Sequence, residues 1–409
     1  MNHAQKALSG ITHLIQPPRL ADITMFYAPS SGGVRTYLDA KQRWFEHHCV
    51  CRHRLFVPGG VYRRTDTRVE LPAMPIAPLQ GYRFPMRGSA WYRALDDWAP
   101  SMIEAADPYR LGWLASDYAA RRQIPAVAFF HSDLIGMLER RLGALSRPMI
   151  TAYLQRLYRR FDLLLAPSNS MASKLMDLGF TNVAVQPLGV DIQTFSPARA
   201  EPQALRRRYG IQDNKRLLVF AGRNAREKNI PALVDAARRL GPGYHLIIAG
   251  LGMPHTGLSN VTTIDTHLTT EQTAWLLASA DALLHGGDCE TFALIALEAQ
   301  ACGTPVVGVR AGAMTERVED AGFGTLAKEA EGTALASAVQ ALFTQWPQAL
   351  HGGPERAALR GWVVSRFNWD TVLRGLLGHY ARLGLEVEPG VAPRAKWDAS
   401  SANTGLALI

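Results

Sequence analysis

The chain has 409 residues, of which 47% are hydrophobic and 19% are charged. This composition excludes a mainly disordered chain, and at about 150 residues per domain the length predicts two domains. No uncharged apolar run reaches the roughly 18 residues of a membrane-spanning helix. Residues 1–10 lack the apolar segment of a secretory signal, and four cysteines are too few for a disulfide framework. We therefore expect a cytoplasmic protein.

The basic charge is concentrated in the first half of the chain. Up to Phe195 there are 23 Lys and Arg against 15 Asp and Glu, whereas the remainder has 21 against 20. A one-sided basic domain favours an anionic partner such as a phosphate group, an acidic glycan or a membrane surface, although it can also simply aid solubility. No zinc-finger, RNP or helix-turn-helix signature occurs, so we expect no nucleic-acid partner.

Residues 1–195 alternate between short apolar runs and helical patterns, each bounded by Gly, Pro, Asn or Asp. This alternation predicts a parallel sheet covered by helices. The strands are expected at residues 22–27, 53–57, 101–105, 126–130, 163–166 and 183–186. Helices are expected at 34–47 and, as the longest, at 134–161.

The stretch 196–202 breaks the pattern and is the expected linker, after which a second α/β unit follows over residues 196–365. Its strands are expected at 216–221, 244–249, 261–264, 282–285 and 305–309, and its helices at 230–240, 270–280 (with Thr270 as N-cap) and 291–302. Residues 366–385 read as a C-terminal helix that packs back toward the first domain. Residues 386–409 show no period, and we expect them to be disordered. The fold class is α/β, with two tandem Rossmann-like, doubly wound domains and a ligand cleft between them.

The strongest motif is the run from Gly286 to Pro305, which contains Glu290 and Glu298. Eight residues separate the two carboxylates, and Thr291 is the only polar side chain between them. A carboxylate in so apolar a helix needs a partner, and ligand hydroxyls would supply one. If the helix begins after Glu290, free backbone N–H groups from Thr291 to Leu294 would favour an anion. The alternative is one Glu at a helix N-terminus and one on the surface.

Three further loops follow expected strands. Arg223 and Lys228 could clamp a diphosphate, and Lys228 stands out because the chain has only seven lysines against 37 arginines. Gly32 and Gly33 would permit close backbone approach to a ligand. His131 could position a substrate hydroxyl. Each loop alone could also be structural. The cluster from His47 to His53 matches no zinc spacing, so we expect no metal site.

Taken together, these motifs resemble the retaining glycosyltransferases of the GT-B fold (glycosyl transferases group 1, family 4 type). The shared pieces are the Glu290-x7-Glu298 run with the following Ala-Cys-Gly-Thr-Pro, the Gly-Arg-x4-Lys loop, and Pro187 to Asp191 followed by Phe-Ser-Pro. The resemblance covers the chain from about Asp22 to Tyr380.

The resemblance implies a metal-independent enzyme that moves a hexose from a nucleotide diphosphate sugar and needs no other cofactor. His131, Glu290, Arg223 and Lys228 would be catalytic. Arg223 and Lys228 would stabilise the leaving diphosphate, Glu298 would bind ribose hydroxyls, and Glu290 and His131 would contact the sugar. The donor-binding group would comprise Gly32, Gly33, Arg223, Lys228, Glu290, Thr291, Phe292, Ala293, Leu294 and Glu298.

The chain departs from the family where Glu-Gly-Phe-Gly is replaced by Glu290-Thr291-Phe292-Ala293, which leaves less room near the donor. Glu316 matches in place, with no role assigned. The first domain would bind a lipid-linked or glycan acceptor, and its arginines would contact anionic headgroups at the inner face of a membrane. The candidates for that contact are Arg63, Arg64, Arg83, Arg87, Arg121 and Arg122. The alternatives are an epimerase or phosphorylase of the same fold, or a non-catalytic scaffold that binds nucleotide sugars.

Overall fold

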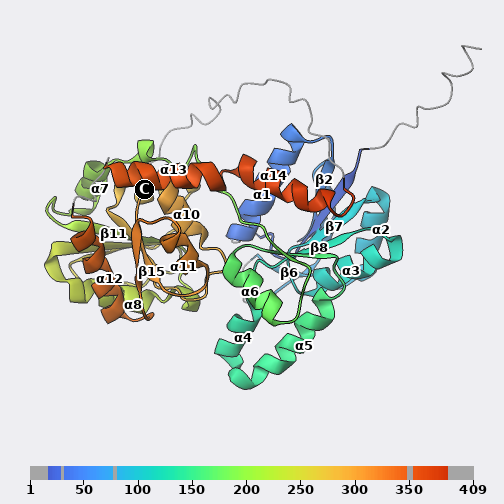
Figure 1. Cartoon of the computed structure of the whole chain (residues 1–409), viewed down its shortest axis with the longest axis horizontal. Helices are drawn as coiled ribbons and strands as arrows, with labels where there is room; N and C mark the ends of the chain where they lie inside the picture. The colour runs from blue at the N-terminus through green and yellow to red at the C-terminus, as the bar shows by residue number, and fades with distance from the viewer. Residues whose placement is uncertain (1–16, 29–31, 77–80, 348–352, 386–409) are drawn as a thin grey trace, which may run out of the picture.

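The structure is a computed structural model that describes residues 17–28, 32–76, 81–347 and 353–385 (Figure 1). The expectations for the N-terminal segment and for the tail at 386–409 concern residues outside these ranges, as does part of the loop that precedes Gly32. Within them, no helix is both long enough and apolar enough to cross a membrane.

The described residues of the first half form an eight-stranded sheet in the order β10-β9-β8-β7-β1-β2-β4-β3. All neighbouring strands are parallel except the short edge pair β3 and β4. The strands are β1 (Arg19–Ile23), β2 (Arg52–Gly59), β3 (Arg63–Arg64), β4 (Arg68–Pro72), β7 (Met102–Ala105), β8 (Ala126–Phe129), β9 (Leu163–Ala166) and β10 (Val183–Val185). The helices are α1 (Gly33–His48), α2 (Gly88–Trp98), α3 (Arg110–Arg122), α4 (Leu134–Leu142), α5 (Arg147–Tyr158) and α6 (Asn169–Asp177). A separate pair, β5 (Met74–Pro75) and β6 (Arg83–Phe84), is antiparallel.

The second half forms a six-stranded, all-parallel sheet in the order β13-β12-β11-β14-β15-β16. Its strands are β11 (Arg216–Ala221), β12 (Tyr244–Ala249), β13 (Val261–Ile264), β14 (Ala282–Leu284), β15 (Val306–Val309) and β16 (Gly324–Ala327). Its helices are α7 (Pro202–Tyr209), α8 (Ile230–Leu240), α9 (Thr270–Ser279), α10 (Leu294–Ala301), α11 (Gly312–Glu319) and α12 (Gly332–Gln345). The side chains of β11 from Leu217 to Phe220 are fully buried, as expected for a strand covered by helices on both faces.

Two C-terminal helices connect the halves (Figure 1). Helix α13 (Pro354–Phe367) packs on α10, and α14 (Trp369–Ala381) packs on α1 of the first half. The chain crosses at Val190, whose N–H donates to the carbonyl of Phe367 at 2.7 Å. The Trp44 indole N–H donates to Asp370 at 3.0 Å, which holds the start of α14 on the first half. The boundaries proposed from sequence for the two domains stay a prediction.

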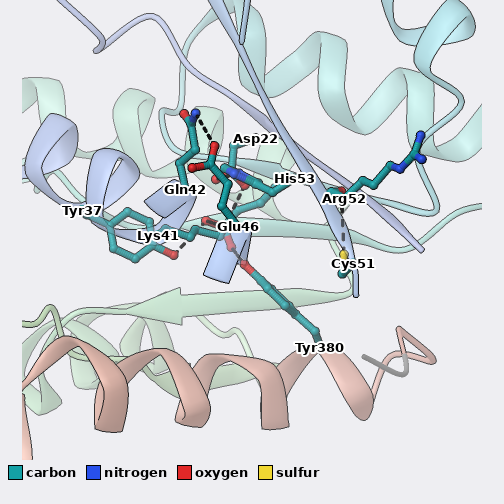
Figure 2. A network of polar contacts seen from close by, with 10 residues as sticks. Asp22, Tyr37, Lys41, Gln42, Glu46, Cys51, Arg52, His53 and Tyr380 are labelled. Atoms are coloured by element: carbon teal, nitrogen blue, oxygen red, sulfur yellow. Dashed lines mark hydrogen bonds and ion pairs between the residues drawn. The ribbon is translucent and has the colours of Figure 1, made fainter. Parts of the chain in front are cut away.

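A network of buried charges joins α14 to the first sheet (Figure 2). The Lys41 ammonium lies 2.7 Å from Asp22 and 2.9 Å from Glu104, and all three side chains are almost completely buried. His53 Nε2 lies 2.8 Å from the other oxygen of Asp22, and the Tyr380 hydroxyl of α14 donates to Glu104. Burial raises the pKa of both carboxyls, but Lys41 and His53 outweigh it at Asp22, whose pKa is lowered, whereas the pKa of Glu104 stays raised. The network is thus a charged core within the first domain.

Three sequence-based boundaries are wrong. The strand expected at 22–27 is β1 at 19–23, and the helix expected at 134–161 is two helices, α4 and α5. Gly143 stands between them with φ of +83°, a left-handed conformation that ends α4. Helix α9 is capped by Thr269 rather than Thr270, because Thr269 and Gln272 form a reciprocal capping box.

Candidate active site

Two loops of the second domain come together at the carboxyl ends of the neighbouring strands β11 and β14. One loop carries Arg223 and Lys228, and the other carries Glu290. A Cβ atom on Gly286 would lie 3.1 Å from the Asn229 carbonyl oxygen, and one on Gly287 would lie 2.7 Å from that of Glu227. The Gly-Gly pair is therefore required because the backbone of the Lys228 loop passes directly against it.

This close approach pairs Lys228 with Glu290. The Lys228 ammonium donates to Glu290 Oε1, and the two side chains remain 20% and 16% exposed. His285 Nε2, which sequence reasoning missed, lies 3.3 Å from the same oxygen. Burial alone would raise the pKa of Glu290, but Lys228 and His285 outweigh it and hold that pKa well below its usual value. Glu290 is therefore ionised, and its position directly after β14 and a Gly-Gly turn was the signal for this group.

Arg223 is not brought to this pair. Its side chain is 68% exposed, and its guanidinium donates to Glu227 Oε1 at 2.6 Å within the same loop. Arg223 and Lys228 therefore each contact a carboxylate, Arg223 at the surface and Lys228 at a less exposed position.

The loop after Glu290 differs from the sequence prediction, which began a helix at Thr291. Helix α10 begins at Leu294, and Ala293 is its N-cap with φ of +62°. Contacts from distant elements hold the preceding backbone out of the helix: Ala313 N–H donates to the carbonyl of Glu290 (3.0 Å) and Ser168 hydroxyl to that of Thr291 (2.9 Å). The free N–H groups of the helix end are thus displaced from Thr291 toward Leu294. Left-handed Ala293 is strained where the family often has glycine.

Phe292 is turned into the protein interior. Its ring is buried against the guanidinium of Arg317, 4.8 Å from the ring centroid, and Arg317 also lies 4.3 Å from the Phe367 ring. Burial lowers the pKa of Arg317 to about 10, which leaves it charged. Phe292 therefore anchors the loop near Phe367, where the chain passes between the two domains. Only the backbone of Phe292 could contact a ligand.

Glu298 lies on α10 as predicted, about one helical turn after Leu294. Its carboxyl has no hydrogen-bond or ion-pair partner among the residues that the structure describes. Burial raises its pKa to about 8. A partly buried carboxyl without a partner is unfavourable in its ionised form, so this group is suited to accept hydroxyl donors from outside the protein.

The first domain meets this loop through its own strand ends. A Cβ atom on Gly33 would lie 3.7 Å from the Leu294 side chain, and nothing lies within 4 Å of one on Gly32. The carbonyl of His131 accepts from the Thr291 hydroxyl at 3.0 Å. The His131 ring stacks on Phe129, and burial, with a smaller effect of Lys41, lowers its pKa to about 3, so the ring is neutral. Its buried Nε2 has no hydrogen-bond partner in the described chain.

Two more contacts cross between the domains. The Glu316 carboxylate accepts from the backbone N–H groups of Asn169 (3.0 Å) and Ser170 at the start of α6, which suits a negative charge at a helix N-terminus. Arg140 donates to Asp288 at 2.6 Å. Glu316 therefore holds the domains together rather than facing the Lys228 group.

The His and Cys residues around His47 are separated by their contacts. His53 pairs with Asp22, whereas His48 Nδ1 donates to the Trp44 carbonyl (2.9 Å). Over the described ranges, no group of three or more His, Cys, Asp or Glu side chains is placed to hold a metal ion.

Comparison with known proteins agrees with this arrangement. The sequence model for Glycosyltransferase Family 4 matches residues 32–194, and that for Glycosyl transferases group 1 matches residues 202–355. A GDP-mannose-dependent alpha-(1-6)-phosphatidylinositol dimannoside mannosyltransferase of Mycobacterium tuberculosis is 32% identical over 73% of this chain and 81% of its own. A GDP-mannose-dependent alpha-mannosyltransferase of Corynebacterium glutamicum is 27% identical over 90% of both chains.

Among solved structures, the sucrose-phosphate synthase of Thermosynechococcus elongatus superposes with a TM-score of 0.72 over 90% of this chain and 99% of its own, at 18% identity. This likeness confirms the GT-B fold, with two Rossmann-like domains. The sequence relatives confirm the enzyme class that the motifs indicated. The chain belongs to the group 1, family 4 glycosyltransferases and is a nucleotide-sugar-dependent glycosyltransferase.

Proposed function

We propose that the protein transfers mannose from GDP-mannose to a lipid-linked acceptor, with retention at the anomeric carbon and without a metal ion. The observation that carries the proposal is the Lys228–Glu290 pair at the strand ends of the second domain, together with the carboxyl of Glu298 on the following helix, which has no partner among the described residues. The two mannosyltransferases similar to this chain use GDP-mannose, and one acts on a phosphatidylinositol dimannoside.

The donor diphosphate would lie between Lys228 and the N-terminus of α10. Lys228 is a point charge that would neutralise the leaving phosphate, the task that a metal ion performs in other enzymes. The N–H groups at the start of α10 would add hydrogen bonds. Arg223 is exposed on the same loop, and it would exchange Glu227 for a phosphate oxygen.

Glu298 would accept hydrogen bonds from the ribose hydroxyls, and the exposed part of Glu290 would accept them from the sugar. The neutral ring of His131 has a free Nε2 that would contact the sugar near its anomeric carbon. In the transfer, the bond from the anomeric carbon to the phosphate oxygen breaks as the acceptor oxygen bonds to that carbon on the same face. The acceptor proton passes to the departing phosphate.

The test is product analysis with GDP-mannose in EDTA, with phosphatidylinositol in detergent micelles as the first acceptor. We expect an α-mannoside, identified by NMR, and release of GDP. Transfer of mannose to a glycan but not to the lipid would indicate a glycan acceptor instead of a lipid-linked one. An acceptor-free isomer of the donor would indicate an epimerase, sugar phosphate would indicate a phosphorylase, and binding without turnover would indicate a scaffold.

Because such an acceptor resides in a bilayer, we also propose that the enzyme binds the membrane peripherally through its basic first domain. The charge excess of that domain supports this proposal.

A further inference from the structure

Helices α4 and α5 form a hairpin, here called the α4–α5 hairpin (residues 134–158), that projects from the first domain (Figure 1). Large apolar side chains gather at its tip. Leu145 is 96% exposed, Met149 67% and Leu142 61%, and the exposed Met137 and Tyr153 continue the patch along the two helices. Exposed large apolar side chains gathered in one hairpin turn favour an interaction site.

The same segment is basic. Residues 134–158 contain four arginines and one glutamate, a net charge of +3. Arg147 lies 3.6 Å from that glutamate, Glu139, whereas Arg141 has no ion-pair partner among the described residues. The apolar tip is therefore bordered by arginines, which is the composition of elements that lie in the interface of an anionic bilayer.

The hairpin is also linked directly to the candidate active site. Asp133, two residues after His131, caps α4 by accepting from the Gly136 N–H at 3.0 Å. Arg140 of α4 donates to Asp288, which is two residues before Glu290. A membrane that contacts the hairpin would thus lie beside the loop that carries the donor group.

Four of the six arginines singled out from sequence lie in a second segment, residues 60–88, which also carries the exposed Val61, Met74 and Phe84. The other two, Arg121 and Arg122, lie on α3. Residues 60–88 have five arginines and two acidic residues, a net charge of +3. Arg83 is partly engaged there, since it donates to the Ala73 carbonyl at 3.0 Å. The two segments have the same net charge, but the α4–α5 hairpin carries the more exposed Leu145 and is joined to the donor loop.

We infer that the α4–α5 hairpin docks on an anionic phospholipid bilayer, with Leu142, Leu145 and Met149 in the boundary between headgroups and acyl chains and the arginines on lipid phosphates. The inference rests on the proposed function in one respect, since it gives a membrane-borne acceptor a route to the site. The docking itself is measurable without turnover.

The experiment is co-sedimentation of the full chain with phosphatidylcholine vesicles and with vesicles of phosphatidylcholine mixed with phosphatidylglycerol, at low and high salt. The test variant is Leu145→Glu/Met149→Glu. The matched control is Val61→Glu/Met74→Glu, which adds the same charge at exposed apolar positions of the second segment. Thermal unfolding and GDP-mannose binding by calorimetry verify that both variants are folded.

We expect wild-type protein and the control to bind the anionic vesicles at low salt, and the hairpin variant to bind at least about tenfold more weakly. Wild-type protein that binds vesicles through the hairpin but binds no nucleotide would support the docking surface and contradict the proposed function. Equal binding by the hairpin variant, or loss of binding only in the control, would overturn the inference. So would a wild-type dimer, seen by light scattering, that the hairpin variant dissociates.

Discussion

The two domains each contain a lysine paired with a carboxylate, and the surroundings of the two pairs differ. In the first domain, Lys41 is completely buried and forms ion pairs with Asp22 and Glu104. The Tyr380 hydroxyl donates to Glu104 as well. In the second, Lys228 and Glu290 stay partly exposed at the strand ends, and the Glu298 carboxyl on the following helix has no partner among the described residues. The first arrangement leaves no place for a ligand and stabilises the fold. The second leaves polar groups for a donor.

The largest expected effect separates the pairs by stability. Lys41→Met leaves two buried carboxyls without their cation, so it should lower the free energy of unfolding by about 3–5 kcal/mol. Urea unfolding monitored by circular dichroism measures this change. Donor affinity, measured where the variant is folded, should stay close to that of the wild type. A loss below about 1 kcal/mol would contradict a structural role for the Lys41 network.

The same substitution in the second domain should act in the opposite way. Lys228→Met removes the charge that neutralises the leaving diphosphate, so kcat should fall by roughly 100-fold or more, whereas the free energy of unfolding should fall less than in Lys41→Met because Glu290 stays partly exposed. Steady-state kinetics with GDP-mannose, beside urea unfolding of the same variant, give both readouts. Unchanged turnover would remove the diphosphate-clamp role from Lys228.

Tyr380→Phe tests how far the C-terminal helix depends on the first cluster. The variant loses the hydroxyl that donates to Glu104 and should lower the free energy of unfolding by about 1.5–3 kcal/mol. Hydrogen exchange of α14 should rise first, because this helix is held on the first domain in part by that contact. If exchange rises uniformly over the chain instead, the contact is not specific to α14.

Glu298→Gln should have the smallest effect, a loss of donor affinity of roughly tenfold. The informative readout is pH. The pKa of Glu298 is raised from the usual 4.5 to about 8 in the folded protein, so its contribution to stability is complete below pH 4.5 and is lost as pH rises through 8. Wild-type thermal stability should therefore fall over this range relative to Glu298→Gln.

Donor binding should also ionise Glu298, since ribose hydroxyls donate to the carboxylate. Near pH 7, GDP binding to the wild type should release up to about one proton, which calorimetry in buffers of different ionisation enthalpy detects. Glu298→Gln should release none. Equal proton release by both proteins would place the ribose elsewhere.

Sequence patterns predicted much of the second sheet closely because β11 and β12 are buried runs directly followed by glycines. The bounds of β11, α8, β12 and β13 are those expected, and Gly222 and Gly250 stand at strand ends in left-handed conformations. The sequence also predicted that Lys228 and Glu290 lie at the same edge of the sheet, because each follows a parallel strand. The roles proposed for the site residues stay predictions.

What sequence reasoning missed depends on contacts between distant segments. The start of α10 is set by Ser168, His131 and Ala313, none of which a local pattern connects to Thr291. Likewise, Lys41 stands on an ordinary amphipathic helix, and only folding shows that Glu104 and Tyr380 surround it. The rarity of lysine in this chain pointed to Lys228. It applies equally to Lys41, for which no role was predicted from sequence.

The most direct measurement is a calorimetric titration of GDP-mannose, in EDTA, into the wild type, Lys41→Met and Lys228→Met. The account predicts binding to the wild type and to folded Lys41→Met with similar affinity, and binding to Lys228→Met that is weaker by roughly tenfold or more. Equal affinity in all three proteins, or no binding to the wild type, would contradict the claim that the partly exposed pair is the donor site.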